Sequence, residues 1–204
     1  MNRSHRSDDY RPRSRGGFTL VEALVAIGVA VMAGSVLLLG LNSSVQTTEE
    51  AMRQTIAQGI AEQLIDEVVG CRYMAPGATP YQTTFGPSGS ERATGTRELF
   101  NDVDDFDGFA AQPPEDPWGV PLGKDDGVGG ERHPVFQLPE SYFDNWREEI
   151  EIGYVDESDL TASLPHGQVS DYRLVEVRVL YDRPEGGARE LARVRRVVAY
   201  VPPL

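Results

Sequence analysis

The chain has 204 residues, enough for one domain, or for one modest domain with an extension, but not for two large ones. Its 32 acidic residues outnumber its 19 lysines and arginines, and the formal net charge of -13 opposes binding to nucleic-acid phosphates, so we expect no nucleic-acid partner. The single cysteine, Cys71, excludes an intramolecular disulfide and any cysteine-clustered zinc or iron–sulfur site. The fold must therefore be held together by its core.

A long apolar run follows a basic N-terminal leader. The run, Phe18–Leu41, has Glu22 as its only charged residue, and as a helix it would be about 36 Å long, enough to cross a hydrocarbon core of about 30 Å. The leader, residues 1–17, carries five arginines and two aspartates, and positive charge beside a first span stays on the cytoplasmic side. We therefore expect a single transmembrane helix, residues 18–41, with the N-terminus in the cytoplasm and the remainder outside.

A secretory signal peptide is the first alternative to this anchor. Its apolar region would contain about 7 to 15 residues and would end in a small-x-small cleavage site. Here the run continues to Leu41 and passes into Asn42–Gln46 with no such site clearly placed. On length alone, an uncleaved signal anchor that carries an external domain is the second alternative.

The junction between leader and run has the sequence RGGFTLVE over Arg15–Glu22. It resembles the signal shared by type IV prepilins and by the pseudopilins of type II secretion systems. The resemblance implies that a prepilin peptidase cuts between Gly17 and Phe18 and methylates the new amine of Phe18. It also implies that Glu22, a charge that is costly within a span, pairs with the Phe18 amine of a neighbouring subunit and sets the register of helices in a filament.

The helix is expected to continue through residues 42–70. Seven apolar residues recur at helical spacing and form one stripe: Ile56, Ala57, Ile60, Ala61, Leu64, Ile65 and Val68. Gly70, followed by Cys71 and then by Pro76, provides a stop signal. The pattern therefore predicts one helix that is half membrane anchor and half backbone of a domain.

Residues 71–204 are expected to form a periplasmic globular domain. Residues 71–139 are rich in Gly, Pro, Ser, Thr and Asp and predict a long irregular loop. Three strand-like segments follow it: Glu149–Val155, Asp171–Tyr181 and Arg189–Val201. The last two show alternating apolar residues and predict an antiparallel hairpin, and a sheet with one apolar face could bury itself against the helix stripe.

These elements predict an α+β fold in which a long N-terminal transmembrane and amphipathic helix packs on a C-terminal antiparallel sheet, which is also the pilin-like fold that the resemblance implies. The segment Ala57–Glu67 looks like the helix continuation of minor pseudopilins of the I type. The expected function is that of a structural minor pseudopilin in a periplasmic type II secretion pseudopilus, with no enzymatic activity. A minor pilin of a type IV pilus is the alternative. The expected partners are the prepilin peptidase, other pilin or pseudopilin subunits and the inner membrane.

Acidic residues concentrate in one segment of the loop, where Glu98–Asp116 contains seven carboxylates and no basic residue. Oxygen-rich clusters suit calcium. However, aligning Gly108 with the turn glycine of an EF-hand puts Val103 at the first ligand position and Pro114 where the bidentate Glu should be. We expect a solvated acidic loop and no cofactor, with a calcium site or a partner-binding patch as the alternatives.

Residues suited to catalysis are scarce. His133 and His166 lie in separate loops without the spacing of a metal site and are expected on the surface. Trp118 and Trp146 are expected to be core or interface aromatics. Cys71, at the helix end, is expected to be a buried or inert thiol.

Overall fold

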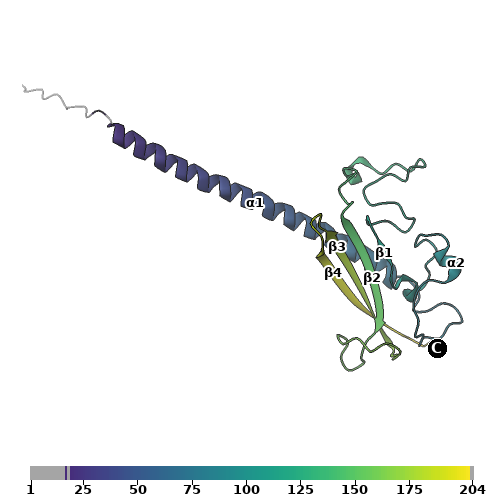
Figure 1. Ribbon diagram of the computed structural model, residues 1–204. Helices are drawn as coiled ribbons and strands as arrows, with labels where there is room; N and C mark the ends of the chain where they lie inside the picture. Colours follow the sequence, from purple (N-terminus) through teal and green to yellow (C-terminus); the bar gives the residue numbers. More distant parts are fainter. Residues whose placement is uncertain (1–16, 18, 203–204) are drawn as a thin grey trace, which may run out of the picture. The chain divides into compact units, whose positions relative to one another are not determined.

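A computed structural model describes residue 17 and residues 19–202. The first element is helix α1, Leu20–Val69, which is 50 residues long (Figure 1). The chain divides into two compact units at Glu50, so that α1 contributes to both of them. The helix ends where the sequence predicts: the N–H groups of Gly70 and Cys71 still donate to carbonyls of the last turn, at 3.0 and 3.1 Å.

The second unit contains a four-stranded antiparallel sheet with the strand order β1-β2-β3-β4 (Figure 1). Its strands are β1 (Ala110–Ala111), β2 (Trp146–Tyr154), β3 (Tyr172–Asp182) and β4 (Ala188–Ala199). The three longer strands correspond to the three predicted segments. The sequence did not indicate β1, because two residues are too few to show an alternating pattern.

Strands β3 and β4 form the predicted hairpin. Val177 of β3 lies opposite Ile150 of β2 on one side and opposite Val194 of β4 on the other. The turn between β3 and β4 contains Gly186 and Gly187 with φ angles of 94° and 84°, a region that favours glycine because it has no Cβ. The hairpin therefore follows from two features of the sequence: two segments in which apolar residues alternate, and two glycines between them that can adopt the turn.

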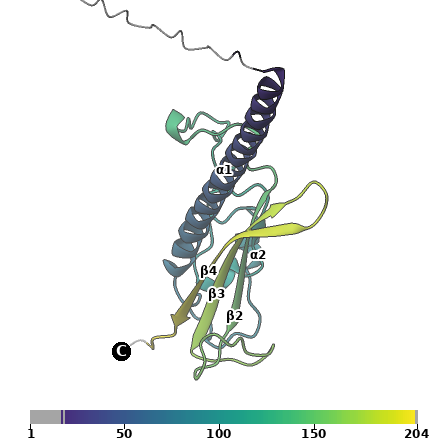
Figure 2. The same cartoon turned by 90° about the vertical axis from the view of Figure 1, so that its left-hand side faces the viewer.

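In the second unit α1 lies beside the sheet (Figure 2), and the two share one hydrophobic core. The helix buries six residues of the predicted stripe: Ala57, Ile60, Ala61, Leu64, Ile65 and Val68. The three long strands contribute seven: Trp146, Ile150, Ile152, Val175, Val177, Val179 and Ala192. Full burial of a large apolar side chain contributes roughly 1.5–3 kcal/mol, so this contact is the main source of stability for a unit without a disulfide. The expected helix-on-sheet layout is confirmed.

The chain between α1 and β2 is mostly irregular and wraps beside the sheet. It includes three short helices: α2, Gly89–Arg92, the 3-10 helix η1, Val103–Phe106, and the 3-10 helix η2, Pro134–Phe136. Val103, Phe106 and Phe143 from this region join the core. The irregular region is thus attached to the sheet rather than free of it.

Candidate functional site

The start of α1 carries the residues of the predicted processing and assembly site. Phe18 lies outside the described residues, and Gly17 is exposed and without regular structure. The Thr19 N–H and hydroxyl both donate to Glu22 Oε2, at 2.9 and 3.0 Å, and the Glu22 N–H donates to Thr19 Oγ1 at 3.2 Å. This reciprocal pair is a capping box, which supplies partners for backbone N–H groups that the first helical turn leaves free. The sequence pattern Thr-x-x-Glu before an apolar run could have predicted it.

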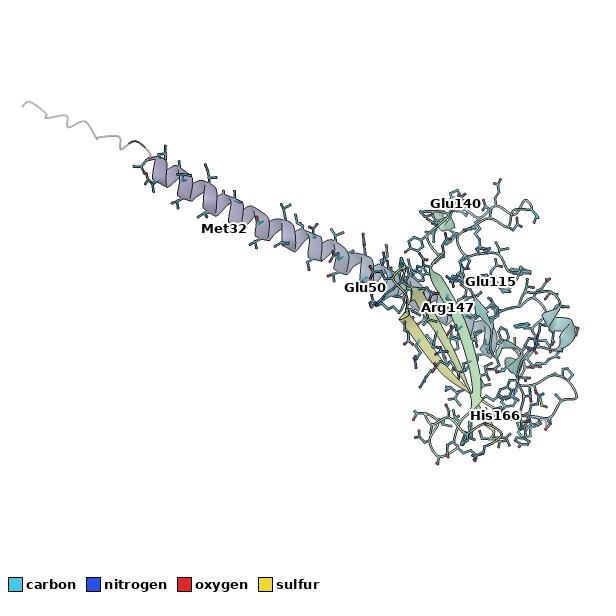
Figure 3. The ribbon with its side chains drawn as sticks, in the orientation of Figure 1. Met32, Glu50, Glu115, Glu140, Arg147 and His166 are labelled. Atoms are coloured by element: carbon cyan, nitrogen blue, oxygen red, sulfur yellow. The ribbon has the colours of Figure 1, made fainter. Side chains whose placement is uncertain are left out.

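The first half of α1 is a candidate membrane span. A window of this helix has a mean hydropathy of 2.5, and none of that window is buried against other described residues. Large apolar side chains project from it on all sides, as the stick view shows around Met32, which is 73% exposed (Figure 3). A helix that is apolar all round is suited to lipid or to packing among other helices, and not to one face of a soluble domain.

Glycines occur at intervals along this apolar half, at positions 28, 34 and 40. A Cβ built at Gly28, Gly34 or Gly40 would meet no heavy atom of the described chain within 4 Å. Small residues on a spanning helix allow a second helix to approach closely. The apolar half of α1 therefore has three positions where close approach is sterically possible.

The acidic segment is not the solvated loop that the sequence predicts. Asp102, Asp104 and Asp105 are buried, because the segment folds into η1 against the core. Asp102 caps η1, and its Oδ1 accepts the Asp104 N–H at 3.1 Å, while Asp105 Oδ2 accepts the Asn101 and Asp102 N–H groups at 2.8 and 3.2 Å. Asp107 Oδ1 accepts the Ile152 N–H at 2.8 Å. These carboxylates therefore serve as hydrogen-bond acceptors for backbone N–H groups and fix the local conformation of the chain.

Burial also changes the proton affinity of this segment. It is the largest cause that raises the pKa of Asp102, and the hydrogen bond with Asp104 and the charges of Asp104 and Asp105 act in the same direction. Burial likewise raises the pKa of Asp105 and of Asp107. The segment therefore holds protons more tightly than an exposed acidic loop would.

Within the described part of the chain two arginines are buried, and Arg173 on β3 is one of them. Its side chain is fully buried, and Nη1 lies 3.1 Å from Asp104 Oδ1. The same guanidinium donates to the Tyr73 carbonyl at 2.6 Å and to the Pro80 carbonyl at 3.2 Å. Its Cζ lies 4.2 Å from the ring centroid of Tyr73 and 4.9 Å from that of Phe85. One side chain thus joins three parts of the irregular region to the sheet.

Arg97 in the irregular region forms the second buried cation site and is 3% exposed. Its Nε donates to Glu67 Oε1 of α1 at 3.1 Å, and its Nη1 donates to Glu148 Oε1 of β2 at 3.3 Å. Nη2 donates to the Glu115 carbonyl at 3.1 Å, and the Cζ lies 4.5 Å from the ring centroid of Phe109. The Arg97 site therefore ties the helix, the loop and the sheet together.

Glu148 is the most deeply buried member of the Arg97 site, at 1% exposure. Burial raises the pKa of its carboxyl to about 7, although Arg97 and the Glu115 N–H, which donates to it at 3.2 Å, oppose the rise. Sequence reasoning missed this site, because Glu67, Arg97 and Glu148 lie in three separate segments and follow no common spacing. The only indication of this site in the sequence was that Arg97 directly precedes the acidic segment Glu98–Asp116.

The structure does not group the other candidate residues. No cluster of three or more His, Cys, Asp or Glu side chains in residues 17 and 19–202 has the geometry of a metal site. His133 and His166 are both exposed, and Figure 3 shows His166 at the end of the sheet opposite to Glu50. Trp146 lies in the core, as expected, whereas Trp118 is 65% exposed and is not a core residue.

Cys71 is half-buried against the core, and its thiol lies 3.5 Å from the Glu67 carbonyl. Burial is the largest cause that raises the pKa of this thiol, and the charges of Glu67 and of nearby aspartates add to the effect. A raised pKa lowers the fraction of reactive thiolate. The expected inert thiol is thus favoured by the surroundings of Cys71.

Comparisons with protein-family models, with curated proteins and with solved structures found no match to this chain.

Proposed function

We propose that this chain is a structural subunit of a periplasmic filament, anchored in the inner membrane by the apolar half of α1. More narrowly, we propose a minor pseudopilin-like subunit of a type II secretion pseudopilus, which joins the filament through its N-terminal helix after cleavage by a prepilin peptidase. The narrower proposal rests on the resemblance of Ala57–Glu67 to minor pseudopilins of the I type. Its partners are then the peptidase and other pilin-type subunits.

One observation carries the proposal: the sequence RGGFTLVE over Arg15–Glu22 leads into α1, which begins at Leu20 and is apolar on all sides over its first half. Gly17 is suited to the cleavage position, because a residue without a Cβ fits a narrow protease cleft in an extended conformation, and it lies outside the helix. The helix begins at Leu20, and its first turn is capped by Thr19 and Glu22. Cleavage after Gly17 would leave this cap within the mature chain.

The second unit supports a structural role better than an enzymatic one. Its buried charged residues are paired with one another or with backbone groups, as at Arg97 and Arg173. Such pairs hold the irregular region to the sheet. The carboxylates and the arginines of these sites therefore have a structural use that requires no substrate.

Mass spectrometry of the N-terminus of the membrane-extracted protein tests the proposal. We expect a chain that begins with N-methylated Phe18. Gly17→Leu should abolish cleavage and leave membrane insertion intact, because insertion depends on the apolar run. Gly28→Leu is the matched control, since it makes the same substitution within the span and should be cleaved normally. A mature-sized Gly17→Leu protein would refute the peptidase assignment, and a wild-type chain that retains Arg15 would favour an uncleaved signal anchor.

A further inference from the structure

The outer edge of β4 offers unpaired backbone groups. The Tyr200 N–H donates to the Asp171 carbonyl at 2.7 Å, and the Val155 N–H donates to the Tyr172 carbonyl at 3.1 Å. In an antiparallel sheet, successive residues of a central strand bond to its two neighbours in turn. Asp171 therefore bonds toward β4 and Tyr172 toward β2, and every second residue of β4, counted from Tyr200, bonds to β3. The N–H and C=O groups of the intervening residues point away from the sheet: Arg193, Arg195, Val197 and Ala199.

This edge is long and has little protection. β4 has 12 residues, whereas an average strand has about 5–6, and it pairs with β3 alone in the described part of the chain. Edge strands are usually protected by shortness, proline, bulges or charge. Here the pairing irregularity lies at one end, beside Val179 and Leu180, and β4 itself contains no proline. Charge is the remaining protection.

The side chains of β4 define what a pairing strand would have to present. On one face of the sheet, Arg193 and Arg195 are about half exposed. On the other face, Val194 and Val198 are only partly covered by the core. A strand added at this edge would place successive side chains on opposite faces. It would therefore match β4 best if acidic and apolar residues alternated along it.

The arginines of this edge outnumber the carboxylates that pair with them. Arg193 pairs with Glu190 of the same strand, at 2.6 Å between Nη2 and Oε2. Arg195 pairs with Glu176, and Glu176 also lies within 3.7 Å of Arg178 and within 3.6 Å of Arg193. Arg196, which is exposed, forms no ion pair with any residue of the described chain. The edge of β4 thus carries more positive charge than its neighbours neutralise, on a protein whose net charge is -13.

β2 and β3 already show how a strand of alternating acidic and apolar residues pairs with a strand that carries an arginine. Within β2, Glu149–Ile152 alternates Glu and Ile, and both isoleucines lie in the core. Both glutamates face Arg178 of β3, whose Nη2 lies 3.3 Å from Glu149 Oε2 and 3.4 Å from Glu151 Oε2. An acidic–apolar strand is therefore compatible with the basic–apolar pattern of this sheet.

We propose that the outer edge of β4 binds an extended segment of a partner protein in which acidic and apolar residues alternate. Main-chain hydrogen bonds to residues 193–199 supply affinity, and the arginines select for acidic side chains. Antiparallel pairing of residues 193–199 with the same residues of a second copy would place Arg196 opposite Arg196, which is unfavourable. The inference is independent of the N-terminal cleavage site and of the filament.

The test uses the full-length protein in detergent micelles and a fluorescent, acetylated and amidated peptide of sequence VEIEIEV. We expect saturable binding with a Kd below about 1 mM, measured by fluorescence anisotropy, and no comparable binding of the lysine counterpart VKIKIKV. Val197→Pro removes an outward N–H without removing a bond to β3, and should weaken binding at least tenfold. Val197→Ala, which keeps the N–H, is the matched control and should bind normally.

Charge reversal gives a second, independent readout. A variant with both Arg193→Glu and Arg195→Glu, which lie on the same face, should lose the acidic peptide and gain the lysine peptide, while circular dichroism remains unchanged. Three results would overturn the proposal: no saturable binding, binding that survives Val197→Pro, or equal binding of both peptides to the wild type. A concentration-dependent dimer that Val197→Pro abolishes would instead assign the edge to a second copy and would also overturn it.

Discussion

Replacing Arg97 with methionine should strongly destabilise the unit from Glu50 onward. The substitution removes the guanidinium that pairs with Glu67 and Glu148 and leaves Glu148, at 1% exposure, without a cation. Breaking a buried ion pair by removing one partner costs about 3–5 kcal/mol. For a unit of this size, each kcal/mol lowers Tm by roughly 2–4 °C, so the expected loss is about 6–20 °C.

The decrease in Tm caused by Arg97→Met should become larger as pH rises. The pKa of Glu148 is about 7 in the presence of Arg97, which opposes the rise, and it should be higher still without it. At pH 5.5 the carboxyl can accept a proton and avoid a buried charge, whereas at pH 8 it must either stay charged or take up a scarce proton. The decrease in Tm caused by Arg97→Met should therefore be larger at pH 8 than at pH 5.5.

Thermal unfolding of the full-length protein in detergent, followed by near-ultraviolet circular dichroism, measures both effects. Arg178→Met is the matched control, because Arg178 is more exposed and pairs at the surface with Glu149 and Glu151, where ion pairs contribute only about 0–1 kcal/mol. In a variant with both Arg97→Met and Glu148→Met, most of the lost stability should return. Equal decreases in Tm for Arg97→Met and Arg178→Met, or a decrease that does not change with pH, would refute the reasoning.

Three further predictions concern the whole chain. Burial raises the pKa of Asp102 and of Glu148 above their ordinary values of 3.8 and 4.5, so the folded protein holds protons that the unfolded chain releases. The protein should therefore become less stable, with a lower Tm, as pH rises from about 4.5 to about 7. In Glu148→Gln, Tm should change less over this pH range. Glu22→Ala should insert normally but lose crosslinking to neighbouring helices in membranes, and so should Glu22→Gln, which keeps a capping acceptor but not the charge; undiminished crosslinking of both variants would exclude the proposed register role. A fragment that begins at residue 46 should be soluble and folded by circular dichroism, because the core of the second unit begins at Ala57; aggregation would mean that the boundary is misplaced.

The parts of the fold that were predictable from sequence are those with a repeating pattern. The apolar stripe of α1 and the alternation in Asp171–Tyr181 both correspond to one face of one element, so the spacing of a few residues identifies them. The helix end at Gly70 and the β3–β4 turn follow from glycines for a local reason. Each of these features depends on residues that are close together in the sequence.

The parts that could not be predicted depend on residues far apart. Asp104 was expected in solvent, because nothing within its own segment indicates that Arg173, 69 residues later, lies beside it. The Arg97 site likewise joins residues that are 30 and 51 positions away. A carboxylate-rich segment is exposed or buried according to whether distant cations meet it. At the start of α1, by contrast, the pattern Thr-x-x-Glu is local and is sufficient to predict the cap.

The long separations around Arg173 impose an order of events when the chain is made. The carbonyls of Tyr73 and Pro80 and the carboxylate of Asp104 precede their common partner by 100, 93 and 69 residues. At a synthesis rate of about 5–20 residues per second, the earliest of these groups waits on the order of 5–20 s before Arg173 exists. During that interval these three groups lack their shared guanidinium, because β3, which carries it, has not yet been made. The contacts around Arg173 can form only after β3, Tyr172–Asp182, has been synthesised.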